Sequence, residues 1–344
     1  MDVVIGLVLA VASGGIQGAF FLPMKYMKGW EWENGWLVFT LACCVFFPVV
    51  LAFVFTPDLP GIYARSGGTV LGTVFLFGLG WGVGVILYGL GAKFLGMAMG
   101  IAIVTGINAC LGTLFPALFL EAGRIPASAW LVLGLGMVVL LLGVVVMARA
   151  GALRDRQLNA GAAHAADVPF AAGLAVCIGG GILCPMMNFG IFFGRPITRA
   201  VADLGTVAPY NVGYAQLLPV FLGGSLAQAA YCVYLFRKNR SAANFALAGT
   251  ASNWFKGVLM ALIFVAGMVV YTIAATNYIG DIGPIVGWPL FLSATIIVSN
   301  ACGVLTGEWK GVDGKARRMM YAGIALLIVA IVLASLSNSF VPPA

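Results

Sequence analysis

Long apolar stretches recur along the whole length of this sequence. A helix that spans a bilayer needs about 20 consecutive apolar residues, and the hydropathy of the 344 residues predicts ten such segments. They cover residues 2–24, 34–56, 70–92, 97–119, 129–147, 170–193, 210–236, 256–276, 283–305 and 319–338. With 62% hydrophobic and 8% charged residues, the composition excludes an ordinary soluble globular protein. The sequence therefore predicts an all-α integral membrane protein with ten transmembrane helices.

Lysine and arginine are unevenly distributed between the loops that join these segments. Of the 18 Lys and Arg residues, 14 fall in the loops after the odd-numbered segments. The loops after the even-numbered segments hold Arg65, Arg124, Arg195 and Arg199. Because basic loops remain in the cytoplasm, the pattern predicts a multi-pass membrane protein with both termini outside, in the periplasm if the membrane is a bacterial inner membrane. These loops also account for the net charge of +7, so we expect no nucleic-acid partner.

The most polar interval, residues 149–169, follows the fifth segment and divides the chain into halves of five helices, residues 1–148 and 170–344. With an odd number of spans in each half, a second half that repeats the first must enter the membrane inverted. Gly14-Gly15-Ile16 in the first segment matches Gly180-Gly181-Ile182 in the sixth, although such a match can arise by chance in a glycine-rich chain. We therefore expect a cytoplasmic connecting loop between two inverted five-helix repeats.

Residues 75–116 combine glycines with isolated polar and aromatic side chains. The stretch reads as two spans joined by a short turn at residues 93–96. Its small-xxx-small pairs are Gly78/Gly82, Gly80/Gly84 and Gly96/Gly100. Because such pairs let two backbones approach closely, we expect tight helix contacts around a pocket. Trp81 and Asn108 fall near the middle of their spans, where an amide is costly unless it is paired or lines a cavity.

The same stretch carries a family resemblance. It reads F-G-x-x-W-G-x-G-x-x-x-Y-G-L at residues 77–90 and F-L-G-M-x-M-G-I at residues 94–101. This pattern resembles the L-rhamnose/proton symporter family of the drug/metabolite transporter superfamily. The resemblance begins at residues 23–33, recurs at Asn188 and ends near Gly307-Glu308-Trp309, so it covers most of the chain.

The resemblance implies the drug/metabolite transporter fold, with two inverted five-helix repeats, and import of L-rhamnose or a related deoxy or pentose sugar together with a proton. The sequence departs from the family pattern at three positions. Val85 and Leu87 occupy positions where the third helix of the family has asparagines, and Pro284 stands where an aspartate is expected.

A sugar site needs amides for the hydroxyl groups and a flat aromatic face for the C–H side of the ring. The candidate substrate-binding residues in or near the spans are Gln17, Trp81, Tyr88, Asn108, Asn188, Tyr214, Gln216, Trp288 and Asn300. For each amide the alternative is a hydrogen bond to a carbonyl of a neighbouring helix. For Trp81 the alternative is packing in the core.

Proton coupling needs a titratable group, but no carboxylate lies in the middle of a predicted span. The candidates are therefore the carboxylates nearest the membrane: Asp281, Glu33 and Glu308. Asp281 lies between glycines and shortly before Pro284, a composition typical of the broken helices that line transport sites. For Glu33 the alternative is an ion pair with Lys25 at the same membrane face.

The sequence favours a transporter over an enzyme. The single histidine, His164, falls in the polar loop, and the seven cysteines lie in apolar spans without a C-x-x-C pair. We therefore expect no enzyme activity, metal or cofactor. The predicted function is secondary active import of L-rhamnose or a similar deoxy sugar by proton symport through alternating access. The alternative is a drug/metabolite-type exporter or facilitator of another small metabolite. Its expected partners are the sugar, protons and the lipid bilayer, and the oligomeric state stays open.

Overall fold

The computed structural model describes residues 2–95, 97–119, 123, 125–158, 169–279 and 282–340. All regular elements in these ranges are helices. Ten of the helical segments are long and apolar enough to cross a membrane, as predicted. They are Asp2–Tyr26, Trp32–Phe55, Gly68–Leu95, Gly100–Leu118, Ala127–Leu158, Phe170–Ala202, Pro209–Asn239, Ala251–Ile279, Gly283–Leu305 and Gly314–Asn338.

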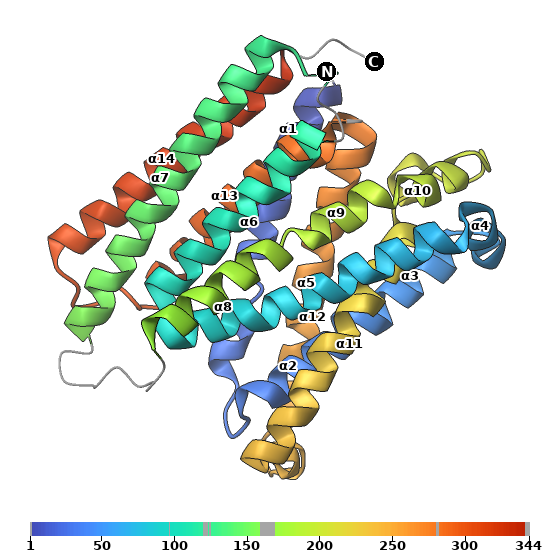
Figure 1. Ribbon diagram of the computed structural model, residues 1–344. Coiled ribbons are helices and arrows are strands. Elements are labelled where there is room, and N and C mark those ends of the chain that lie inside the picture. Colours follow the sequence, from blue (N-terminus) through green and yellow to red (C-terminus); the bar gives the residue numbers. More distant parts are fainter. Residues whose placement is uncertain are drawn as a thin grey trace.

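The helices form one bundle in which the two halves of the chain are interleaved (Figure 1). The first half contains α1 (Asp2–Gly18), α2 (Trp32–Leu41), α3 (Phe47–Phe55), α4 (Leu59–Ser66), α5 (Gly68–Leu95), α6 (Met97–Phe119) and α7 (Ala127–Leu158). The second half contains α8 (Phe170–Leu183), α9 (Met186–Phe193), α10 (Arg195–Ala202), α11 (Tyr214–Asn239), α12 (Ala251–Ile273), α13 (Gly283–Leu305) and α14 (Gly314–Asn338).

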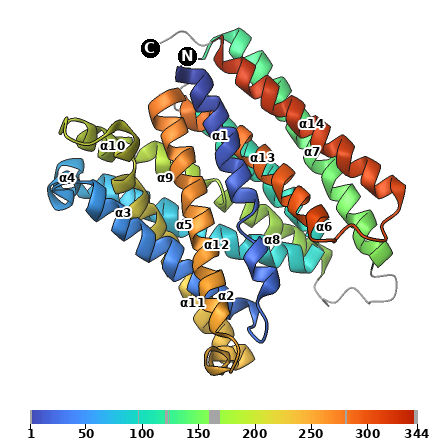
Figure 2. The ribbon, with the colours of Figure 1, turned by 180° about the vertical axis from the view of Figure 1, so that it is seen from behind.

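Both chain termini lie at the same end of the bundle, as an even number of spans requires (Figures 1 and 2). We call this the terminal end. The loops after the odd-numbered spans lie at the opposite end, which we call the basic end because it carries most of the Lys and Arg residues. α7 and α14 pack along each other at one flank, so they frame the bundle and leave its centre to the other spans (Figure 2).

Two connections differ from those expected. Residues 93–95, the expected start of the turn, belong to α5, α6 begins at Met97, and Gly96 lies outside the described residues. α7 extends to Leu158, well beyond the predicted span end at residue 147. The extension contains Ala, Leu, Arg and Gln, which are all good helix formers, so the helix continues where hydropathy falls. The lone histidine, His164, lies outside the described residues.

Several spans are interrupted. The sixth span breaks between α8 and α9 at Cys184-Pro185, where Pro185 has no backbone N–H to continue the α-helical ladder. In the second span, a π-helical segment, Ala42–Phe46, separates α2 from α3 just before Pro48. A second π-helical segment, Ala274–Ile279, follows α12. Such interruptions reorient the side chains that follow them, and the break at Pro185 brings Asn188 into the centre of the bundle.

The glycines of α5 create close contacts on two sides of that helix. A Cβ atom on Gly78 or Gly82 would meet the carbonyl oxygens of Val220 or Gly224 on α11. On the other side, a Cβ on Gly84 would lie 2.7 Å from the backbone at Cys184, next to α8. The two predicted glycine pairs of α5 therefore serve two different neighbours, both in the second half of the chain.

Candidate functional site

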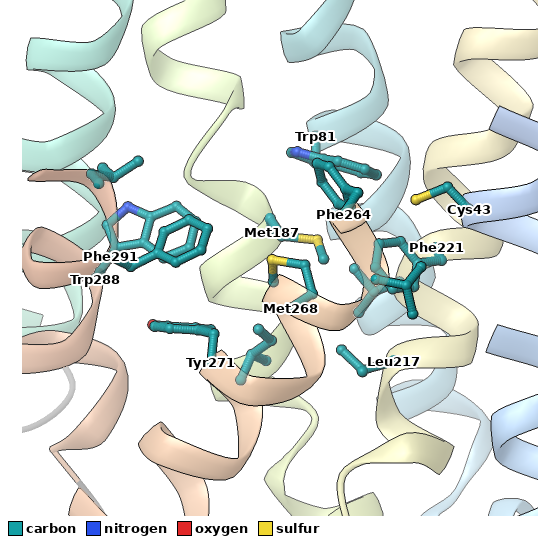
Figure 3. Close-up of a cluster of buried hydrophobic side chains, with 14 of the residues drawn as sticks. Cys43, Trp81, Met187, Leu217, Phe221, Phe264, Met268, Tyr271, Trp288 and Phe291 are labelled. Carbon is teal, nitrogen blue, oxygen red and sulfur yellow. The ribbon is translucent and has the colours of Figure 1, made fainter. Parts of the chain in front are cut away.

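The centre of the bundle is an aromatic cluster with two methionines (Figure 3). We call it the central core and define it as Trp81, Met187, Phe221, Phe264, Met268, Tyr271, Trp288 and Phe291. In Figure 3 the side chains of Met187 and Met268 lie between Trp81 on α5 and Trp288 on α13.

Trp288 anchors one side of the central core. Its ring stacks on Phe291 with centroids 5.4 Å apart, and Tyr271 meets it edge to face at 5.6 Å. The Trp288 Nε1–H donates to Asn108 Oδ1 over 3.3 Å. Gly112, one turn after Asn108, leaves room for the indole, because any side chain there would collide with it. The predicted residues Asn108 and Trp288 therefore meet, and they place an amide beside a flat aromatic face.

Asn188 on α9 holds four helices together through its side-chain amide. Its Nδ2 donates to the carbonyl oxygens of Gly112 and Pro284, both over 3.0 Å, and its Oδ1 accepts from the Tyr271 hydroxyl at 2.7 Å. These bonds link α9 to α6, α13 and α12. Asn188 is fully buried, and each of its amide atoms has a partner. Asn188 therefore matches the alternative given for each amide, a hydrogen bond to a carbonyl of a neighbouring helix.

Trp81 is a packed side chain in this structure. It is 6% exposed, and its ring contacts Phe221 and Phe264 at centroid distances of 5.9 and 6.0 Å. A Cβ atom on Gly224 would lie 2.5 Å from the indole, so the ring also fills the surface of α11. The stacking of a solute on Trp81 therefore stays a prediction.

Gln216 and Tyr214 lie on α11 towards the terminal end. Gln216 Nε2 donates to Ile191 O at 2.9 Å, and its Oε1 accepts from the Thr198 hydroxyl, so this buried amide ties α9 and α10 to α11. Tyr214 lines a narrow crevice with Tyr210, Thr272 and Thr276. A separate hollow of about 420 Å³ between α4 and α10 is lined by no residue of the central core.

Tyr88 and Asn300 lie away from the central core. Tyr88, near the basic end of α5, packs against a small cluster of Val104, Cys177 and Cys184. Asn300 donates from Nδ2 to the carbonyl oxygen of Ile296 on its own helix, at 2.9 Å. A backbone carbonyl within the same helix is the usual partner of such a side chain, so nothing connects Asn300 with the centre.

Gln17 differs from these amides because its Oε1 makes no hydrogen bond with the described residues, although the residue is only 6% exposed. The oxygen lies against α12, where a Cβ atom on Gly267 would be 2.8 Å away.

The carboxylates lie at the edge of the bundle. Glu33, 2% exposed, accepts from Asn239 Nδ2 at 2.9 Å and from the Ser241 hydroxyl. The predicted alternative, a Lys25–Glu33 ion pair, is wrong. The helical turn after α1 carries Lys25 to the loop after α13, where it pairs with Glu308. Asp281, the first candidate for proton coupling, lies outside the described residues.

Glu308 is the centre of an ionic cluster at the basic end. Besides Lys25 it binds Arg154 Nη1 over 3.1 Å, and Asp155 holds the same guanidinium at 2.8 Å. Arg154 also lies 5.3 Å above the ring of Trp309. Lys25 and Arg154 belong to the first half of the chain and Glu308 to the second. The cluster therefore joins the two halves at this end.

Sequence reasoning missed Tyr271, Met187, Met268 and Phe264 as parts of the centre. They look like ordinary members of apolar spans. One available signal was the spacing of Phe264, Met268 and Tyr271, which places three large side chains on one face of a helix. No group of three or more potential metal ligands occurs among the residues that the structure describes.

The family model and the two relatives described next carry the name of one kind of protein. Residues 1–339 match the family model described as L-rhamnose-proton symport protein. The chain is 29% identical over 335 residues to an L-rhamnose-proton symporter of Cronobacter sakazakii, with 95% of this chain and 96% of the relative covered. A symporter of the same name from Mannheimia succiniciproducens is 27% identical over 339 residues, with 96% of both chains covered.

A solved crystal structure also shares the fold. It matches with a TM-score of 0.57 over 96% of both chains, at 17% sequence identity. At that identity the similarity shows a shared fold and nothing further.

Proposed function

Because this chain belongs to the L-rhamnose-proton symport protein family, we propose that it imports L-rhamnose or a similar deoxy sugar together with a proton. The observation that carries the proposal is the pairing of Asn108 with Trp288 at the centre of a ten-span bundle. The indole offers a flat face to the C–H side of a sugar ring. The Asn108 amide nitrogen makes no hydrogen bond with the described residues, so it can donate to a hydroxyl group.

The solute site that we propose lies between Trp81 and Trp288, in the space that Met187 and Met268 now fill (Figure 3). Methionine is unbranched and adapts its shape readily. A sugar entering this space displaces the two thioethers and places its ring between the indoles. Tyr214 and the crevice that it shares with Thr272 and Thr276 form the approach from the terminal end. Asn188 and Gln216 support this site by fixing the helices around it.

We further propose that the bundle consists of two inverted repeats that exchange access between the two membrane faces. The helix packing supports this. α1, the first span of the first half, packs on α12 and α13, the third and fourth spans of the second half. α8, the first span of the second half, packs on α5 and α6, the third and fourth spans of the first half. This reciprocal arrangement is expected of inverted repeats.

For the proton we propose Asp281. It stands three residues before Pro284, whose carbonyl oxygen accepts a hydrogen bond from Asn188. A change of charge at this point of the chain can therefore act on the network around the solute site. Glu308 is a weaker candidate because two cations favour its charged form. Glu33 is buried near the basic end, away from the central core, and its partners are neutral.

Uptake of labelled L-rhamnose by proteoliposomes, with and without an inward proton gradient, tests the transport proposal. We expect accumulation that needs the gradient and is lost with a protonophore. Asp281→Asn should abolish accumulation but keep exchange of sugar for sugar, and Asp203→Asn, at an exposed site, should behave like the wild type. If folded wild-type protein takes up no sugar, the proposed function is wrong. If Asp281→Asn accumulates sugar normally, the proton is carried elsewhere.

A further inference from the structure

A second aromatic group lies towards the basic end, next to the central core. It consists of Phe20, Trp36, Phe39 and Phe264, and we call it the inner aromatic group. Its ring centroids are 4.7 Å apart for Trp36–Phe39, 5.2 Å for Phe20–Phe264 and 5.6 Å for Phe39–Phe264. Phe264 also contacts Trp81, so the inner aromatic group continues the central core without interruption.

Gln17 borders this group from α1. It precedes Phe20 by three residues, and Phe20 N donates to its carbonyl oxygen, so the two residues share one side of the chain. The unpaired Gln17 Oε1 lies against Gly267. Gly267 belongs to the face of α12 that presents Phe264 and Met268 to the core, because residues three and four apart share a helix face. The unpaired acceptor therefore points at the border between the two aromatic groups.

Gln228 borders the same group from α11. It is fully buried, and its Oε1 accepts from Trp36 Nε1 at 3.0 Å and from the Thr40 hydroxyl at 3.5 Å. Its Nε2 has no partner among the described residues. Gln17, three residues from Phe20, thus leaves an acceptor unpaired, and Gln228, bonded to Trp36, leaves a donor unpaired.

Leaving these atoms unpaired costs stability. An unsatisfied buried polar atom typically costs more than a hydrogen bond gains, and native proteins contain few of them. The same bundle satisfies both amide atoms of Asn188 and of Gln216. An apolar residue at position 17 would avoid the penalty. A ligand with hydroxyl groups would pair both atoms, because a hydroxyl both donates and accepts.

We propose that Gln17 and Gln228 line a second sugar subsite, through which the solute passes between the central core and the basic end. One hydroxyl of the sugar donates to Gln17 Oε1, another accepts from Gln228 Nε2, and the apolar side of the ring lies on the inner aromatic group. The subsite rests on the proposed function and extends it, since it assigns the polar contacts of the sugar on its way to release.

Gln17→Leu tests the subsite, because leucine has a similar volume and no polar atom. Gln216→Leu is the matched control, since both of its amide atoms have partners. In thermal melts of the full-length protein in detergent, Gln216→Leu should melt below the wild type. Gln17→Leu should melt at or above the wild-type temperature, because it removes an unpaired buried atom. A fall like that of the control would show a structural role for Gln17 and overturn the proposal.

The binding test is competition against labelled L-rhamnose in proteoliposome exchange, with analogues that each lack one hydroxyl. Gln17→Leu should weaken the full sugar about tenfold, which corresponds to about 1.4 kcal/mol. One analogue, the one without the hydroxyl that Gln17 binds, should compete equally well in wild type and variant. Gln228→Leu should show the same pattern with a different analogue.

The outcomes separate the two proposals. If wild-type protein exchanges no sugar, the transport function fails, and this is seen before any variant is made. If the wild type exchanges L-rhamnose but Gln17→Leu binds every analogue as the wild type does, transport stands and the second subsite is wrong.

Discussion

At the scale of single residues, the molecule contains buried amides of two kinds. Asn188 and Gln216 have partners on both amide atoms and hold helices in place. Gln17 and Gln228 each have an atom without a partner. The first kind contributes to stability, and its removal should be visible in unfolding. The second kind reduces stability, and its removal should be visible in solute binding.

Tyr271→Phe should destabilise the protein, because it removes the donor to Asn188 Oδ1 and leaves that oxygen buried and unpaired. We expect a loss of about 1 kcal/mol in the free energy of unfolding, the usual scale for hydrogen bonds between membrane helices. Thermal melts in detergent would measure it. Tyr214→Phe, in the crevice, is the control and should melt like the wild type. If Tyr271→Phe melts at the wild-type temperature, the hydrogen bond between Tyr271 and Asn188 contributes nothing to stability.

At this scale the sequence pointed to side chains that meet at the centre of the bundle. Asn108 stands out because an amide in the middle of a span needs an explanation, and Asn188 and Trp288 stand out because a sugar site needs amides and flat aromatic faces. The structure joins Asn108 to Trp288 and binds Asn188 to Gly112, which lies on the same helix as Asn108. Tyr271 lies near the end of its predicted span and reads as an ordinary member of it, so the sequence does not single it out. The Lys25–Glu33 pair failed because closeness in the chain says little about which loop a lysine reaches.

At the scale of elements, α5 depends on its neighbours. Glycine is a poor helix former, costing about 1 kcal/mol relative to alanine, yet α5 is rich in it. Gly78 and Gly82 face α11, and Gly80 and Gly84 face α8 and α9. Close packing on two sides therefore replaces the intrinsic helix preference that the sequence lacks.

Gly78→Ala should destabilise this packing, because the new methyl group would collide with the backbone of Val220. We expect a loss of about 1–3 kcal/mol, typical of overpacked interiors. Gly72→Ala, on the same helix but with open space around it, should be neutral or slightly stabilising. The difference between the two melting temperatures is the measurement. If both variants have the same melting temperature, α5 and α11 can move apart to accommodate the methyl group at little cost in stability.

Element positions followed from hydropathy, but helix breaks did not. A proline such as Pro185 is compatible with a kinked span or a broken one, and only the neighbours decide which. The expected break around Asp281 falls partly outside the described residues. The adjoining Ala274–Ile279 is π-helical, and α13 begins at Gly283. The predicted end of the fifth span, at residue 147, also lies before the end of α7. Hydropathy locates the apolar part of a helix, whereas α7 continues into polar residues.

At the scale of the whole molecule, Lys25, Arg154 and Glu308 join the two halves at the basic end. In the alternating-access cycle that we propose, this end opens and these pairs separate. Partly exposed ion pairs contribute about 0.2–1 kcal/mol. Such pairs can favour a form closed at this end without preventing it from opening.

Glu308→Gln should shift the molecule towards the form open at the basic end, by up to about fivefold. Hydrogen exchange measured by mass spectrometry should become faster at the helical turn Leu22–Tyr26 and unchanged at α4 and α10. Asp58→Asn, which removes the pair with Arg65 at the terminal end, should leave the basic end unaffected. Unchanged exchange in Glu308→Gln would show that other contacts keep this end closed.

The orientation in the membrane is a further prediction, since the structure shows only that the termini share one end (Figure 1). The excess of Lys and Arg predicts that the basic end faces the cytoplasm. A reporter active only in the cytoplasm should be silent when fused after Ala344 and active when inserted into the loop after α7. The opposite pattern would reverse the orientation.

The glycine faces of α5 also have a consequence for synthesis of the protein. The surfaces that they fit, on α8, α9 and α11, belong to residues translated long after α5 has entered the bilayer. Until then the glycine grooves of α5 lack the surfaces that they fit. The first five spans are therefore an unfinished intermediate, and assembly of the protein must wait for translation to pass Gly224.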